Sequence, residues 1–247
     1  MKKLKSSLIV ILCILCFSAI IGVIIPLRNS NNGNNGSGSS VDFSTMTYTA
    51  VGDSITWGSI PASGGQQMDE PYPIVVGESL GLKQVANLGI GGSTLAVGNG
   101  TYQSYPMVNR YNQIPKSSDI ISIMGGINDI YRGIPVGTID DTETTTYYGA
   151  LKKLAYNLKV NYSNSYVFFM TPLPNVGSAD GSLLPYVQAV KDVCELYDID
   201  CLDANALSGF ENFMYDIAED GTHPTEEFHR EHLAPLIAQF IKDNYKK

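Results

Sequence analysis

Residues 119–126 read Asp-Ile-Ile-Ser-Ile-Met-Gly-Gly, an apolar run of strand length that stops at two glycines. The stretch 165–170, Ser-Tyr-Val-Phe-Phe-Met, has the same character and stops at Thr-Pro-Leu-Pro. Strands that are apolar throughout, rather than at alternate positions, are typical of a parallel sheet covered on both faces. These two stretches therefore favour an α/β architecture.

Short strands and helical segments alternate along the rest of the chain. We expect further strands at 46–51, 83–88 and 199–202, and helices at 72–80, 142–160, 183–197 and 226–244. Within the second of these helices, Leu151, Leu154, Ala155 and Leu158 recur at helical spacing and define one apolar face. Strands that alternate with helices indicate βαβ units. The sequence thus predicts a three-layer α/β/α sandwich around a five-stranded parallel sheet.

An apolar segment precedes this domain. Lys2, Lys3 and Lys5 stand before an apolar run at 8–25, and a tract of Asn, Gly and Ser follows at 29–40. The run is just long enough to cross a bilayer, and the positive-inside rule keeps the lysines in the cytoplasm. We expect an N-terminal membrane anchor or signal peptide at 1–28, a flexible linker at 29–40 and one folded domain at 41–247. Anchored or cleaved, the segment sends the domain to an extracellular or cell-surface location.

The folded domain is acidic. Residues 41–247 hold 12 Lys and Arg against 24 Asp and Glu, a formal charge of −12. Such a domain lacks the basic patch that nucleic acid requires and is repelled by anionic lipid, so we expect no nucleic-acid partner and membrane contact only through the N-terminal segment. Cys194 and Cys201 are compatible with a disulfide or with two thiols, and the sequence leaves the oligomeric state open.

Residues suited to nucleophilic catalysis stand at the two ends of the domain. Ser54 follows the first expected strand in Gly-Asp-Ser-Ile, and His223 precedes the last expected helix in Asp-Gly-Thr-His-Pro. A serine hydroxyl needs an imidazole to take its proton, and the imidazole needs a carboxylate on its other nitrogen. Asp220 is the candidate carboxylate, three residues before His223. Taken singly, each has a simpler interpretation, a helix-capping serine and a loop histidine beside a capping aspartate.

Glycine-rich turns end the second and third strands, in Gly91-Gly92-Ser93 and in Gly125-Gly126-Ile-Asn128. Ligands of parallel α/β sheets bind at the carboxyl ends of the strands, where these turns converge. Acyl transfer places negative charge on a carbonyl oxygen, and the Gly92 N–H and the Asn128 amide are candidate donors to it. Alone, such turns are weak evidence, because α/β folds use them simply to reverse direction.

In this order, the four segments resemble the SGNH hydrolases, also called the GDSL family, over residues 46–245. The resemblance implies the flavodoxin-like SGNH hydrolase fold and a serine esterase. It implies Ser54, Asp220 and His223 as catalytic residues. It also implies an oxyanion hole from the N–H groups of Ser54 and Gly92 and the Asn128 amide, and no metal or organic cofactor.

Three other residues of these segments are not expected to take part in the reaction directly. Ile55 stands where many family members have Leu, which is a harmless aliphatic exchange. Asp53 and Asp129 are expected to brace loops rather than to react.

The resemblance leaves the substrate open, because one scaffold hosts many substrates. An acidic, exported domain without a long apolar insertion favours a small or polymeric ester, and we expect a carbohydrate O-acetylesterase acting on a glycan. One alternative is a lipase or lysophospholipase acting on longer acyl esters; the other is a non-catalytic surface binding module. A shallow polar cleft beside Ser54 would favour the glycan, and a large apolar patch would favour the lipase.

A few further side chains were candidates for substrate or metal contacts. His229 and His232 are interpreted as exposed polar residues of the last helix rather than as metal ligands. Arg132 either meets an anionic substrate group or pairs with a surface carboxylate. Tyrosines near the expected upper loops would line a carbohydrate cleft: Tyr72, Tyr102, Tyr105 and Tyr131.

Overall fold

The computed structural model describes residues 41–98, 105–209 and 220–246. All of them lie in Ser40–Lys247, one of the two units into which the chain divides. The expected anchor at 1–28 and linker at 29–40 fall outside the described residues. Among the helices of the described ranges, none combines the length and apolar character needed to span a bilayer.

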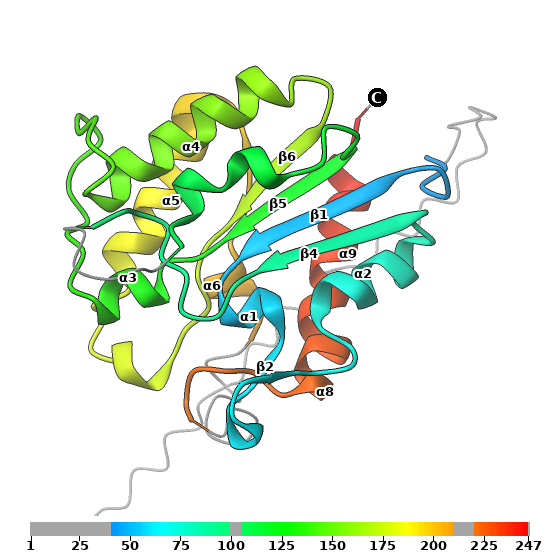
Figure 1. The fold of residues 1–247 in the computed structure, drawn as a ribbon, viewed down its shortest axis with the longest axis horizontal. Coiled ribbons are helices and arrows are strands. Elements are labelled where there is room, and N and C mark those ends of the chain that lie inside the picture. The colour runs from blue at the N-terminus through cyan, green and yellow to red at the C-terminus, as the bar shows by residue number, and fades with distance from the viewer. Residues whose placement is uncertain (1–40, 99–104, 210–219, 247) are drawn as a thin grey trace, which may run out of the picture. The chain divides into compact units, whose positions relative to one another are not determined.

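The centre of the unit is the expected five-stranded parallel sheet (Figure 1). Its strands are β1 (Thr47–Gly52), β4 (Gln84–Gly89), β5 (Ile120–Met124), β6 (Tyr166–Met170) and β7 (Asp200–Leu202). They are ordered β4-β1-β5-β6-β7, which is the flavodoxin-like arrangement with the first strand between the second and third. β5 is buried at every position, as its unbroken apolar sequence predicted.

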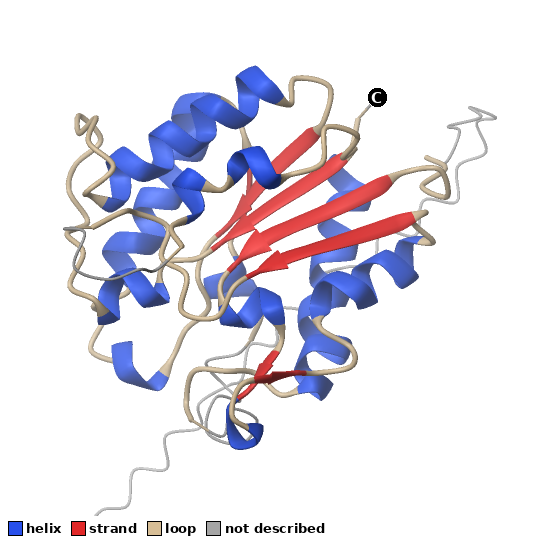
Figure 2. Ribbon diagram, in the orientation of Figure 1, coloured by secondary structure: helices blue, strands red, loops and turns tan. Residues whose placement is uncertain are grey.

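Helices cover both faces of the sheet and complete the three layers (Figure 2). One face packs against α4 (Tyr147–Asn161) and α5 (Leu184–Tyr197), and the other against α2 (Tyr72–Leu80) and α9 (Ala234–Asn244). The apolar face predicted for the first of these helices is buried in the core. The expected start of that helix at 142 was wrong, because Thr146 caps it and accepts the Gly149 N–H at 3.3 Å.

The closing helix is less regular than the continuous 226–244 that we expected. It consists of α8 (Glu226–Phe228), a π-helical turn η5 (His229–Leu233) and α9. Pro235, in the first turn of α9, has no N–H to give to the preceding turn, and its ring crowds the carbonyl four residues back. A widened turn relieves that crowding, and it changes which side chains share a face.

Several short elements had no counterpart in the sequence prediction. Three helices follow β1, β5 and β7 directly: α1 (Ser54–Trp57), α3 (Ile127–Tyr131) and α6 (Ala204–Leu207). A small antiparallel hairpin, β2 (Ser59–Ile60) with β3 (Gln66–Gln67), lies beyond α1. Single 3₁₀ turns are η1 (Pro61–Ser63), η2 (Met107–Asn109), η3 (Tyr111–Gln113) and η4 (Val176–Ser178).

The register of the sheet brings the carboxyl ends of neighbouring strands into line. Gly52 at the end of β1 is paired with Gly89 of β4 and with Met124 of β5, and Met124 is paired with Met170 of β6. The turns that follow these strands therefore emerge side by side, at the edge where α1 and α3 lie in Figure 1.

Candidate active site

Ser54 is the first residue of α1, directly after the central strand β1. Asp53 caps this helix, and its Oδ1 accepts the Ile55 N–H at 3.0 Å. Burial raises the pKa of the Asp53 carboxyl to about 6, although the Ile55 N–H and the charge of His223 act in the opposite direction. The cap fixes the sharp exit of the chain from the strand, and this exit holds Ser54 at the edge of the sheet.

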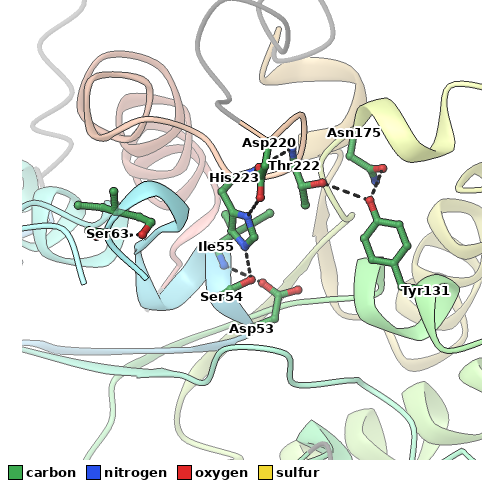
Figure 3. A network of polar contacts seen from close by, with 10 residues as sticks. Asp53, Ser54, Ile55, Ser63, Tyr131, Asn175, Asp220, Thr222 and His223 are labelled. Carbon is green, nitrogen blue, oxygen red and sulfur yellow. Dashed lines mark hydrogen bonds and ion pairs between the residues drawn. The ribbon is translucent and has the colours of Figure 1, made fainter. Parts of the chain in front are cut away.

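A line of hydrogen bonds joins Ser54 to His223 and Asp220 (Figure 3). His223 Nε2 lies 2.7 Å from Ser54 Oγ, and His223 Nδ1 lies 2.7 Å from Asp220 Oδ2. The other carboxylate oxygen accepts the backbone N–H groups of Thr222 at 3.0 Å and of His223 at 2.8 Å. Partial burial would raise the pKa of Asp220, but the hydrogen bonds from His223 and Thr222 outweigh it and lower that pKa.

This arrangement has the geometry of an activated nucleophile. The imidazole is within reach of the hydroxyl proton, and the carboxylate fixes the tautomer that leaves Nε2 free to accept that proton. Asp220 and His223 are held by one short turn, whereas Ser54 comes from the far end of the domain. The fold therefore assembles in space what the sequence offers as two separate fragments.

Gly92 and Asn128 lie on adjoining turns of the same edge. Gly92 adopts φ +71°, a left-handed conformation that favours glycine. Asn128 Nδ2 donates to the Ser93 carbonyl at 3.0 Å, which uses one of the two N–H bonds on that nitrogen. Arg132 Nη2 donates to the Gly92 carbonyl at 3.0 Å, so this guanidinium contacts the glycine turn itself. Two side chains of the α3 segment thus hold the turn that contains Gly92.

A cavity of about 180 Å³ opens above these groups. It brings together Ser54, His223, Asp220 and Asn128 of the predicted site residues, while Gly92 is not among the described residues that line it. Its remaining lining residues are Asp53, Ile55, Ile127, Tyr131 and Thr222.

Asp129 is fully buried and acts as a loop brace. Its two carboxylate oxygens accept the N–H groups of Leu95 at 2.8 Å and Ala96 at 3.0 Å, just after the Gly92 turn. Burial raises the pKa of this carboxyl to about 7. The bracing role expected for Asp53 and Asp129 is confirmed by these contacts.

Arg110 has a position that the sequence did not indicate. It is only 4% exposed, and its guanidinium makes four hydrogen bonds behind the catalytic edge. Nε donates to the Tyr105 carbonyl at 2.9 Å and Nη1 to the Leu88 carbonyl at 2.9 Å. Nη2 donates to the Gly52 carbonyl at 3.1 Å and to Ser93 Oγ at 3.0 Å. One side chain thereby ties the ends of β1 and β4 to the Gly92 turn.

The interpretation of His229 as an exposed helix residue was wrong. His229 is fully buried in η5, and its Nδ1 accepts the Tyr72 N–H at 3.0 Å, whereas His232 is exposed. The continuous helix expected at 226–244 would have set the two histidines on one face, but the π turn shifts the side chains out of α-helical register. Within the described ranges, no three His, Cys, Asp or Glu side chains are grouped to hold a metal ion.

The tyrosines expected around a cleft divide into different environments. Tyr72 is fully buried, so the expectation that it lines a cleft was wrong, and Tyr102 lies outside the described residues. Tyr105 is exposed, and Tyr131 lines the cavity beside Ser54 and His223 while remaining half exposed.

Burial lowers the pKa of His229 to about 3, with the charge of His223 contributing in the same direction. The unfolded chain takes up this proton as the pH falls below about 6.5, whereas the folded chain resists it until about 3. His229 alone should therefore lower the free energy of unfolding by up to about 5 kcal/mol across this window as the pH decreases, against the opposite contributions of Asp53 and Asp129, whose pKa values are raised. In His229→Asn, the amide oxygen replaces Nδ1 as acceptor for Tyr72 without titrating, so the difference in unfolding free energy between wild type and variant should shift against the wild type as the pH falls. Urea unfolding of both proteins at pH 4, 5 and 7 measures the difference, and parallel curves would contradict it.

Comparisons with known proteins identify the family and the fold. The family model for GDSL-like lipases and acylhydrolases matches residues 50–231. A crystal structure of a protein from Lactobacillus plantarum is 26% identical, with a TM-score of 0.69, and the match covers 82% of this chain and 99% of that one. The lipase/acylhydrolase from Enterococcus faecalis shares the fold at 18% identity and a TM-score of 0.59, with 82% and 98% of the two chains covered. No curated protein matches the chain.

The matched region runs from the end of β1, just before Ser54, through the turn that contains His223 and into η5. It thus spans every candidate site residue and nearly the whole sheet. The chain belongs to the GDSL-like lipase/acylhydrolase family and is a carboxylic ester hydrolase.

Proposed function

We propose that this chain is a serine esterase that removes short acyl groups, above all acetyl, from carbohydrate esters. The observation that carries the proposal is the unbroken line from Ser54 Oγ to His223 Nε2 and from His223 Nδ1 to Asp220, at 2.7 Å in both steps. A binding module that merely kept the fold would have no need to align these three groups. The alignment therefore favours catalysis over the binding alternative.

In the proposed reaction, Ser54 Oγ attacks the ester carbonyl carbon as His223 Nε2 takes the hydroxyl proton. Asp220 stabilises the imidazolium that forms. The N–H groups of Ser54 and Gly92 and the second Nδ2–H of Asn128 donate to the oxyanion. His223 then protonates the leaving alcohol, and water, activated by the same imidazole, hydrolyses the acyl-enzyme.

The size of the cavity supports a short acyl group. At about 180 Å³, it is smaller than the 300–1,000 Å³ of typical pockets for drug-sized ligands. Its wall combines the polar groups of Asn128, Thr222 and Asp220 with the apolar side chains of Ile55 and Ile127 and the ring of Tyr131. A cavity of this size suits an acetyl ester better than a long acyl chain, which was the alternative.

The acidity of the domain also favours a glycan over a lipid substrate, because a formal charge of −12 disfavours approach to an anionic lipid surface.

The proposal also includes a location outside the cell, with the domain tethered or released. This part rests on the lysine-flanked apolar run at 8–25. We expect that protease added to intact cells cleaves the domain.

The test is hydrolysis of p-nitrophenyl acetate, butyrate, octanoate and palmitate by the purified full chain, with Ser54→Ala as control. We expect Ser54-dependent turnover with kcat/KM highest for acetate, followed by release of acetate from acetylated xylan. A preference for palmitate would favour the lipase instead. The absence of Ser54-dependent turnover on every ester would contradict the esterase proposal and favour a binding module.

A further inference from the structure

Tyr131 is the last residue of α3 and lies three positions after Asn128. Side chains three apart in a helix share a face, so the helix that directs the Asn128 amide into the catalytic cavity directs the Tyr131 ring there as well. Both residues line that cavity together with Ser54 and His223. The ring therefore forms a wall of the space in which an acyl group bound to Ser54 would lie.

The tyrosine hydroxyl is anchored although the side chain is 55% exposed. Tyr131 Oη donates to Asn175 Oδ1 at 3.1 Å and lies 3.2 Å from Thr222 Oγ1, as Figure 3 shows. A Cβ atom at Gly177 would come within 2.8 Å of the same hydroxyl, so the phenol end sits close against that backbone. These contacts fix the ring across the gap between α3 and the His223 turn.

A second cavity of about 300 Å³ lies at the Asn175 end of this contact. Its lining includes Pro174, Ala179, Leu183 and Leu184, together with Asn175, the residue that accepts the hydrogen bond from Tyr131. Leu184 is 60% exposed and presents apolar surface at this cavity. The hydrogen bond between Tyr131 and Asn175 thus runs from a residue of the catalytic cavity to a residue of the second one.

We propose that Tyr131 determines acyl-chain length: its ring closes the catalytic cavity against the second cavity, which is an acyl-chain subsite that becomes accessible when the ring is removed. The inference rests on the proposed esterase function and deepens it. In this proposal the carbonyl oxygen faces the Asn128 amide, and the acyl group extends from the carbonyl carbon toward Tyr131, three positions further along α3. An acetyl group ends before the ring, whereas a long acyl chain meets it.

The test compares Tyr131→Ala, Tyr131→Leu and Tyr131→Phe with the wild-type full chain on p-nitrophenyl acetate, butyrate and octanoate. The readout is the ratio of kcat/KM for octanoate to that for acetate, which cancels any general loss of activity. We expect the ratio to rise by about 10-fold or more in Tyr131→Ala, because added methylene groups then gain apolar contacts. Tyr131→Leu should raise it less, and Tyr131→Phe, which keeps the ring, should raise it least.

Tyr156→Ala is the matched control, since Tyr156 is 53% exposed on α4, away from both cavities, and its ratio should equal that of the wild type. Selectivity between p-nitrophenyl acetate and 1-naphthyl acetate should not change in Tyr131→Ala, because the inference concerns the acyl side.

An unchanged octanoate ratio in both truncated variants, beside normal wild-type turnover of acetate, would overturn the inference alone. A shift that followed the alcohol rather than the acyl group would overturn it as well. Loss of Ser54-dependent turnover in the wild type would instead overturn the proposed function on which it rests.

Discussion

Replacement of Ser54 by alanine is expected to lower kcat for short-chain esters by about 10⁶-fold, the loss seen when the nucleophile of a serine triad is removed. The alanine leaves the imidazole with no hydroxyl to deprotonate, although the imidazole still faces the same cavity. The residual rate should exceed that of the uncatalysed reaction, because the oxyanion donors and the binding contacts persist. Steady-state turnover of p-nitrophenyl acetate, with active-site titration of the wild type, measures the change.

His223→Ala should cost about as much, and the Ser54→Ala/His223→Ala double variant should cost little more than either one, because the two residues act as a unit. Multiplicative losses in the double variant would mean that the residues act independently, and would contradict the proposed mechanism. Ser54 is a small residue at a helix start, and its backbone bonds do not involve the hydroxyl, so thermal unfolding should match the wild type. A matching midpoint shows that the lost activity is not lost folding.

The sequence predicted the parts of the fold that local patterns encode. The apolar runs at 119–124 and 165–170 became β5 and β6 within one residue, and the Leu151–Leu158 spacing marked the buried face of α4. Asp220 and His223 belong to one turn, so their contact was accessible from spacing alone. The convergence of the glycine turns followed from a general rule about parallel sheets.

Contacts between distant segments were not accessible in this way. Arg110 bonds partners that lie between 5 and 58 positions away in the chain, and Tyr131 reaches Asn175 from 44 positions away. Neither residue stands in a motif, and a single Arg or Tyr has no periodicity to reveal its hydrogen-bond partners. His229 was misplaced for a different reason, since a π turn cannot be seen in a pattern that assumes 3.6 residues per turn.

The edge of the sheet that holds Ser54 is therefore built from two kinds of residue. The residues that would react lie in recognisable segments, whereas the residues that hold those segments in register are single side chains without a local signal. Arg110 is the clearest of these, because its four hydrogen bonds join the segment before Ser54 to the turn that holds Gly92. A change at this residue should disturb folding and catalysis together.

Arg110→Met is expected to destabilise the domain by about 3–5 kcal/mol, because a buried acceptor that loses its donor costs about 1–3 kcal/mol and three carbonyls lose theirs. Methionine fills much of the volume but leaves the carbonyls of Gly52, Leu88 and Tyr105 buried without this donor. The turns at Ser54 and Gly92 then lose their common tie, and a displacement of about 1 Å should lower kcat about 10²-fold even in the folded fraction. Urea unfolding gives the first quantity, and turnover at a temperature where the variant stays folded gives the second.

Two further variants distinguish the loss of the Arg110 hydrogen bonds from a general effect of removing a positive charge. Arg110→Lys keeps the cation but reaches fewer carbonyls at once, so its stability and kcat should fall between those of the wild type and Arg110→Met. Arg230→Met removes an exposed guanidinium that pairs with Glu70 at 3.3 Å, and it should leave the unfolding midpoint and kcat unchanged. If the urea midpoint of Arg110→Met equalled that of the wild type, the four hydrogen bonds would make no net contribution to the free energy of unfolding. If it lost stability but kept kcat, Arg110 would support the fold without positioning the catalytic turns, and the alignment of Ser54 with Gly92 would have to come from Asp53, Asn128 and Asp129 instead.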